Sequence, residues 1–288
     1  MEALRTRIEA SVLAISRPAG STDLRLPRGD PGLFGPDSAC WLVHSDFTAM
    51  LIGGVGALLL QMLHPLALSG VWDHSSFEQD MLGRLRRTAQ FIACTTYGGR
   101  ADAEQLIQRV RRIHAKVRGF APDGRAYAAD DPALLSWVHA AEVSTFLRAY
   151  LRYRNATLSL AQQNQYLNEM ALIAEALGAT NVPRTVADLD DYLEQMRPEL
   201  HCDARTLKTL KLVLNAKAPT ALAQPWTRLM MQAGVDLLPP WAKQQLGVSS
   251  MSPWRQALLR QAVGVAAQPI RWAVRQSSAQ LARQRLAP

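Results

Sequence analysis

An uncharged stretch between Asp46 and Asp73, without a single Asp, Glu, Lys or Arg, constrains this fold more than any other feature. Such a stretch is either a membrane span or the centre of a globular core. A span needs roughly 20 predominantly apolar residues, whereas three closely spaced glycines, Gln61, His64 and Pro65 interrupt this run. We therefore interpret it as a buried helix that ends at Pro65, with His64 on its last turn.

Helical periodicity and helix boundary signals recur along the rest of the chain. No window alternates with the period of two that a half-buried strand requires. We predict an all-α fold, a single large helical domain. We expect an N-terminal helix and loop (1–36), a large helical domain (37–247) and a basic C-terminal tail packed on or beside it (248–288). The predicted helices cover residues 3–16, 37–63, 80–97, 101–118, 132–153, 158–177, 186–197, 203–214, 224–237, 240–246, 253–266 and 269–285.

The positive charge of the chain is concentrated after Asp236, mostly in this tail. The formal net charge is +8, and seven basic residues with no acidic one follow Asp236, so the rest is nearly neutral. The tail could lie on anionic lipid, contact nucleic acid or be a solvated helix face; we expect no nucleic-acid partner. The seven residues are Lys243, Arg255, Arg260, Arg271, Arg275, Arg283 and Arg285.

The cysteines and the N-terminal residues bear on the cellular compartment in which the protein is expected. Cys40, Cys94 and Cys202 share no metal-ligand spacing and are too few for a disulfide framework. The first ten residues alternate charged and apolar side chains, unlike the apolar core of a signal peptide. We expect a cytoplasmic protein, with peripheral contact at the inner membrane surface as an option for the tail.

Four of the six histidines, His64, His74, His114 and His139, lie on or beside strongly apolar predicted helices. A lone histidine there is usually a core residue, but four together favour a metal or haem site. A non-haem centre could use His64, His74 and Asp73, because neutral imidazole suits several transition metals. A haem site needs less: one proximal imidazole, apolar walls and cations for the propionates.

The spacing of the candidate site residues places several of them on the same face of a predicted helix. Arg84, Arg87 and Thr88 are three or four residues apart and so share one face of the 80–97 helix. The 101–118 helix has an apolar stripe formed by Leu106, Val110, Ile113 and Val117. His114 is predicted on its buried side, with Arg118 one turn later on the same face.

A longer series of motifs resembles a known family, the one that includes the latex-clearing rubber oxygenases and the fungal MpaB-type oxygenase of mycophenolic acid biosynthesis. The motifs span about 58–142, and a looser match covers roughly 35–275. The resemblance implies an all-helical domain with a globin-like core that binds b-type haem, and oxidative cleavage of isoprenoid double bonds by dioxygen. The motifs are Leu-Leu-Leu-Gln-Met-Leu-His64-Pro65, Gly70-Val71-x-x-His74-Ser75, Gly83-Arg84-Leu85-x-Arg87-Thr88, His114-x-x-x-Arg118 and Tyr127-x-Ala129-x-Asp131-Pro132-x-Leu134-Leu135-x-Trp137-Val138-His139.

This resemblance also implies roles for individual residues. His114 matches the proximal iron ligand, and Arg118 matches the family arginine one turn beyond it. Arg84 and Thr88 match the arginine and threonine of the distal side. Arg87 replaces a lysine that can ligate iron in the rubber enzymes, and a guanidinium has no free lone pair for this. We therefore expect water or an open position at the iron there.

His64, His74 and His139 belong to the family pattern as cofactor-site residues, with packing or hydrogen bonding around the haem as their expected roles. The sequence thus favours a haem-dependent oxygenase that uses haem b and dioxygen on a small apolar substrate, of which isoprenoids are one class. The electron donor stays open. Two alternatives also stay open: a non-haem metalloenzyme with His64, Asp73 and His74, and a non-catalytic helical protein that docks to membranes.

Overall fold

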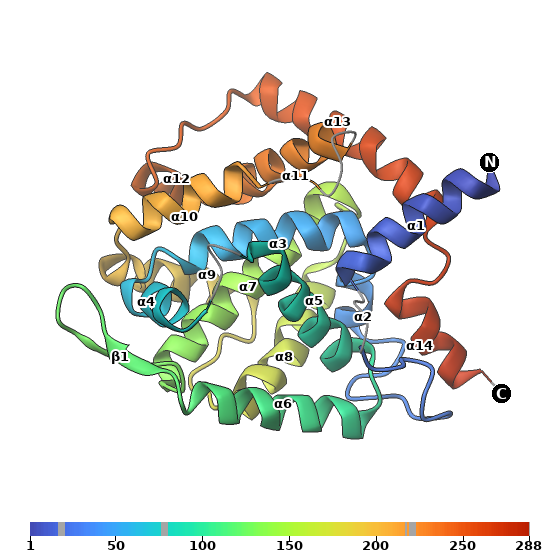
Figure 1. The fold of residues 1–288 in the computed structure, drawn as a ribbon, viewed down its shortest axis with the longest axis horizontal. Helices are drawn as coiled ribbons and strands as arrows, with labels where there is room; N and C mark the ends of the chain where they lie inside the picture. Colours follow the sequence, from blue (N-terminus) through green and yellow to red (C-terminus); the bar gives the residue numbers. More distant parts are fainter. Residues whose placement is uncertain (17–20, 76–79, 217, 219–222, 288) are drawn as a thin grey trace.

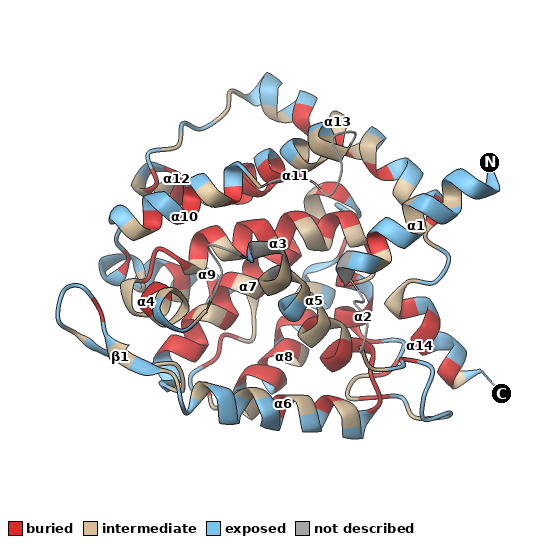
Figure 2. Cartoon of the chain, in the orientation of Figure 1, coloured by how far each residue is buried: buried red, intermediate tan, exposed pale blue. Residues whose placement is uncertain are grey.

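The uncharged stretch forms the central helix of the fold, α3 (Phe47–Gln61). It packs against α7 (Pro132–Tyr153) and α11 (Gln224–Leu237), and the side chains of Ile52, Leu59 and Leu60 are completely buried. Figure 1 shows α3 and α7 inside a shell of other helices, and Figure 2 shows that most of their residues are buried. The computed structural model describes the whole chain except residues 17–20, 76–79, 217, 219–222 and 288.

The remaining elements surround this centre. They pack into one helical domain, which agrees with the predicted fold class. In chain order they are α1 (Glu2–Ser16), α2 (Ala39–Val43), α4 (Pro65–His74), α5 (Met81–Tyr97), α6 (Arg100–His114), β1 (Arg118–Phe120), β2 (Ala126–Ala128), α8 (Leu160–Leu177), α9 (Val186–Gln195), the 3-10 helix η1 (Arg197–Glu199), α10 (Ala204–Leu214), α12 (Pro240–Gln245), α13 (Pro253–Ala273) and α14 (Ser278–Leu286).

No single helix in the described ranges is long and apolar enough to cross a membrane. The pair α3 and α4 passes that test together by length and composition, but the two helices meet at an angle of 107°. Most residues of α3 are buried against its neighbours, as the interpretation of this stretch as core requires.

Polar caps fix several helix starts close to the predicted positions. Asp131 accepts hydrogen bonds from two backbone amides of the first turn of α7, which begins with Pro132. Thr185 and Asp188 form a reciprocal capping box at the start of α9. Gly178 ends α8 with φ at 114°, a left-handed conformation that glycine adopts at low cost.

The prediction of one helix over 37–63 is wrong, because Asp46 interrupts it. Asp46 has an extended backbone and accepts a hydrogen bond from the amide of Ala49, so that it caps α3 and separates it from α2. His64 is likewise not on the last turn of α3. It is the N-cap residue of α4, and Pro65 is the first residue of that new helix, where a missing amide costs nothing.

Two further boundaries differ from the prediction. The 101–118 helix ends at His114, and a short antiparallel hairpin follows in which Gly119 pairs with Tyr127. Three-residue strands are too short for an alternating pattern to be visible. In the tail, the predicted break near Pro269 is absent, because α13 continues through it to Ala273. The predicted 269–285 helix is instead interrupted after Ala273, and α14 begins at Ser278. Pro269 and Val265, whose carbonyl loses its partner, are both exposed, so water can hydrate that carbonyl.

Three of the seven basic residues after Asp236 attach the C-terminal segment to the body. Lys243 is buried and donates to the carbonyl oxygen of Asp236 at 2.8 Å. Arg271 binds the carboxylate of Asp46 at 2.7 Å. Arg285 is completely buried and donates to the carbonyl oxygens of residues 24, 30 and 97. Part of the basic charge is therefore structural, and local sequence alone does not distinguish it from solvated charge.

Candidate functional site

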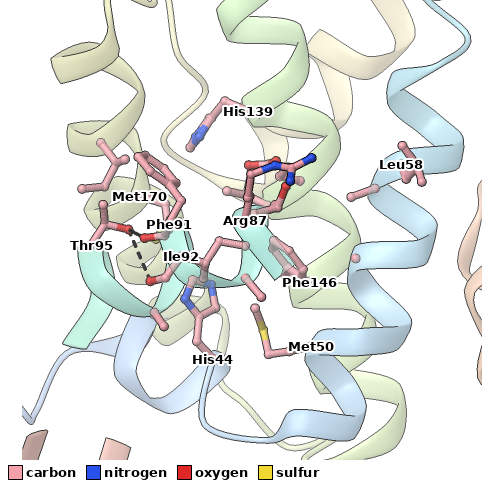
Figure 3. A pocket seen from close by; sticks show the side chains of 18 of the residues that line it. His44, Met50, Leu58, Arg87, Phe91, Ile92, Thr95, His139, Phe146 and Met170 are labelled. Atoms are coloured by element: carbon pink, nitrogen blue, oxygen red, sulfur yellow. Dashed lines mark hydrogen bonds between the residues drawn. The ribbon is translucent and has the colours of Figure 1, made fainter. Parts of the chain in front are cut away.

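A cavity of about 740 Å³ is lined by residues of α3, α5, α6, α7 and α8. Ligand and cofactor pockets typically measure about 300–1,000 Å³. Apolar side chains dominate its walls, and Figure 3 shows Met50, Phe91, Ile92, Phe146 and Met170 around it. The cavity also reaches α1 and the connection between α13 and α14. It can therefore hold a large, mostly apolar ligand.

His139 and His114 of the cavity wall each combine a neutral ring with a ring nitrogen that has no partner in the described structure. Burial lowers the pKa of His139 to about 4 and also lowers the pKa of His114. In the described part of the chain, His139 Nε2 and His114 Nδ1 are buried without a hydrogen-bond partner. An imidazole that is neutral at pH 7 keeps a lone pair for a metal. Both residues are therefore candidate iron ligands by their chemistry.

The way α6 faces the cavity differs from the predicted stripe. Its buried residues are Ala103 and Ile107, and Val110 and His114 follow on the same side toward the cavity. Ile113, which was predicted to be buried, is 50 % exposed at the cavity edge. The periodicity thus predicted correctly that His114 faces inward. It placed the centre of the buried face too close to Ile113 and too far from Ala103 and Ile107.

Arg84, Arg87 and Thr88 of α5 line the cavity, and they share one face as their spacing predicts. Arg84 is half-buried, Arg87 and Thr88 are more exposed, and Arg87 pairs with Asp80 at 3.6 Å. Asp80 also starts this helix by accepting a hydrogen bond from the amide of Gly83. Burial lowers the pKa of Arg84, but a guanidinium still stays charged. The α5 wall therefore supplies positive charge and hydrogen-bond donors.

Glu142 of α7 lies across from this wall and was missed by the sequence reasoning. Its carboxylate accepts a hydrogen bond from Gln61 Nε2 at 3.2 Å, and its accessible surface lines the cavity. Burial raises the pKa of Glu142 to about 7, although Gln61 and the charge of Arg84 act to lower it. The signal was available in the sequence, because Glu142 is the one acid in the apolar run from 132 to 147 and follows His139 by three residues.

His44 is a second residue of the cavity wall that the sequence reasoning missed. Its Nδ1 is 2.9 Å from Thr96 Oγ1 and its Nε2 is 3.0 Å from the hydroxyl of Tyr166. Burial lowers the pKa of His44 to about 3. Both ring nitrogens are thus occupied by hydrogen bonds, and His44 orients the wall rather than offering a lone pair.

The comparison with protein families gives a match over residues 41–268. The matching model is described as "ER-bound oxygenase mpaB/B′/Rubber oxygenase, catalytic domain". The chain belongs to this family. Neither the comparison with curated proteins nor the one with solved structures finds a match. Membership in the MpaB/rubber oxygenase family makes the chain an oxygenase-type oxidoreductase, for which dioxygen and an organic molecule are the reactants.

The structure does not bring all family-pattern residues to the cavity. Arg118 lies on β1 rather than on the helix of His114, and its exposed guanidinium pairs with Asp130 at 3.0 Å. The expectation that it shares a face with His114 is wrong because α6 ends at His114. His64 does not line the cavity either, but packs near Trp137 with ring centroids 6.2 Å apart. Burial lowers its pKa to about 4.

The described residues do not form the non-haem metal site that was considered for His64, Asp73 and His74. His74 does line the cavity, but its Nε2 is 3.2 Å from the carbonyl oxygen of Arg118. Asp73 accepts a hydrogen bond from the hydroxyl of Tyr127 at 2.8 Å and one from Arg205 at 3.4 Å. Among the described residues, no three His, Cys, Asp or Glu side chains are grouped so that they could hold a metal ion.

Proposed function

We propose that this member of the MpaB/rubber oxygenase family is a haem-dependent oxygenase that acts on a small apolar substrate. The observation that carries the proposal is the large apolar cavity with neutral imidazoles on one part of its wall and cationic donors on another. Haem b requires an axial ligand, apolar surroundings and cations for two propionates. The residues present fit each of these needs.

His114 would hold the haem iron in this proposal, and His139 is its competitor. Both are neutral imidazoles, and each has a buried ring nitrogen that lacks a partner within the described ranges. His114 is preferred because it also matches the ligand position of the family pattern. Haem, when bound, supplies the redox chemistry with dioxygen, while the protein supplies orientation and exclusion of water.

Polar side chains of the cavity have distinct tasks in this proposal. Arg84 and Thr88 donate hydrogen bonds to oxygen atoms on which negative charge develops. Arg87 cannot ligate iron, because its guanidinium has no lone pair, and instead supplies positive charge for the propionates. Glu142, whose pKa is raised to about 7, can hold or release a proton at its carboxylate near neutral pH. The apolar walls favour a hydrocarbon-like substrate, and a globin-like arrangement around the haem remains our expectation.

The test is haem analysis of the full chain purified after expression with a haem precursor. We expect a Soret band in the wild type and its loss in His114→Ala, with helical content by circular dichroism unchanged. Added imidazole should partly restore the band by filling the cavity left by the side chain. His201→Ala is the matched control, because His201 is exposed and lies outside the cavity wall.

Three results would contradict the proposal. A wild type that holds iron without a Soret band would indicate non-haem chemistry, and one that binds neither iron nor haem would indicate a non-catalytic protein. If His139→Ala loses the spectrum while His114→Ala keeps it, the ligand is His139.

A further inference from the structure

The outward face of α13 carries a row of apolar side chains that nothing in the described structure covers. Trp254, Leu258, Val265 and Trp272 are 64 %, 58 %, 73 % and 41 % exposed. At about 100° per residue, spacings of 4, 11 and 18 residues place all four within about 40° of one another around the helix. We call these four residues the α13 apolar row. Figure 2 shows exposed residues along α13 at the rim of the molecule.

The opposite face of α13 packs on the protein, so the row is not a misplaced core face. Leu259, Val263 and Ala267 are buried, and α13 lies against α1, α7 and α11. The helix is therefore apolar on two sides. The apolar residues of the inner side pack against the protein, whereas those of the outer side would be buried only by a separate apolar partner. Exposed apolar surface of this extent commonly marks an interaction site.

Charge next to the row identifies the kind of partner. Arg255 and Arg260 are exposed and lie on either side of the row, about 100° and 120° from Trp254 around the helix. No acidic residue occurs after Asp236. The acids of the neighbouring α1 are engaged, since Glu2 and Glu9 bind Arg5, and Glu9 also accepts from the amide of Arg275.

We propose that the α13 apolar row is a docking face for an anionic lipid surface. Helices that lie in a membrane interface combine Trp and Leu on one side with flanking Arg, whose long stems let the charge reach the headgroups. A second copy that packs α13 on α13 would instead bring the same arginines to this face and no acidic residue to neutralise them, because none follows Asp236. The charge pattern thus favours an anionic bilayer over a second copy of the chain.

Docking through this face would bring the lipid surface close to one part of the cavity wall. Val274, two residues after Trp272, lines the cavity together with Ser277, Ser278 and Ala279. A bilayer at the row would therefore lie near that part of the cavity wall, where an apolar molecule dissolved in lipid can approach. This consequence rests on the proposed function, whereas docking itself needs neither haem nor activity.

Vesicle flotation with the full chain tests the proposal. We expect the wild type to bind vesicles of phosphatidylcholine and phosphatidylglycerol more strongly than vesicles of phosphatidylcholine alone. The double variant Leu258→Glu/Val265→Glu should lower binding roughly tenfold or more, because two apolar side chains are replaced by charges that anionic lipid repels. The matched control is Leu160→Glu/Leu172→Glu on α8, whose leucines are similarly exposed at 61 % and 51 %.

Both double variants should keep the wild-type circular dichroism and thermal midpoint, because all four positions are exposed. Arg255→Gln/Arg260→Gln should weaken binding to the anionic vesicles and leave the weak neutral binding unchanged. Wild type that does not float with anionic vesicles, or equal binding by the two glutamate double variants, would overturn the proposal. A dimer in solution that Leu258→Glu/Val265→Glu dissociates, without vesicle binding by the wild type, would assign the row to a second copy. None of these outcomes depends on the Soret band, so they are separate from the test of function.

Discussion

Replacement of Glu142 by Gln should remove a pH-dependent loss of stability. Burial raises the pKa of Glu142 from 4.5 to about 7. Below pH 4.5 the carboxyl is protonated in both folded and unfolded chains, so it has no effect. As the pH rises through 4.5 the unfolded chain ionises first, and the folded state is progressively disfavoured until the pH exceeds about 7. The wild type is therefore less stable at pH 8 than at pH 5 on account of this group.

The size of the effect follows from the two pKa values. At 1.36 kcal/mol per pKa unit, the full penalty is about 3 kcal/mol, of which roughly 2.5 kcal/mol develops between pH 5 and pH 8. A glutamine at this position is uncharged at every pH, and its amide oxygen can still accept the hydrogen bond from Gln61. The stability difference between Glu142→Gln and wild type should therefore shift in favour of the variant by that amount.

The assay is guanidinium unfolding of wild type and variant at pH 5 and pH 8, with matched haem content. Titration of all other groups is common to both proteins and cancels in the difference. Glu104→Gln on α6 serves as the control, since Glu104 is an exposed carboxylate paired with Arg100 at 3.6 Å. A difference between Glu142→Gln and wild type that is the same at both pH values would refute the argument that burial controls this carboxyl.

Two further predictions concern the cavity and the core. Arg84→Ala and Thr88→Ala should keep haem but lower the turnover of a cleavable apolar substrate, each by about 10²–10³, since each removes one preorganised donor. Haem loss from Arg84→Ala would assign that side chain to a propionate instead. Gly53→Ala should destabilise the fold by about 1–3 kcal/mol in chemical unfolding, because its Cβ would lie 2.7 Å from the ring of Phe146. Gly264→Ala on α13 meets no atom within 4 Å and should stabilise by about 0.5–1 kcal/mol; equal effects of both changes would contradict the packing argument.

Helix positions were predictable from sequence where local chemistry fixes them. Asp131, Thr185 and Gly178 act on their own helix ends, and α7, α8 and α9 begin and end within a few residues of the predictions. The failures occurred where partners distant in sequence decide the structure. Asp46 caps α3 while it also binds Arg271, more than two hundred residues away, and this contact is invisible to local periodicity.

The contrast between local and distant determinants also explains which residues of the cavity could be predicted from the sequence. Spacing on one helix placed Arg84, Arg87 and Thr88 together, because that depends on helical geometry alone. Which side of α6 or α7 meets a cavity depends on neighbouring helices. For this reason Glu142 and His44 were not recognised as wall residues.

The two walls of the cavity differ in how they are supported. Gly53 and Gly56 allow α3 to approach α7 closely, since a Cβ on Gly56 would already lie 3.3 Å from the side chain of Thr145. The wall with His139 and Glu142 thus belongs to α7, most of whose residues are buried. The opposite wall, α5, packs mainly against α1, α2, α6 and α14, and its cavity-facing arginines are partly solvated. Substitution of polar α5 residues removes few packing contacts, so their variants report on the chemistry of the cavity, whereas substitutions on α3 report first on the stability of the fold.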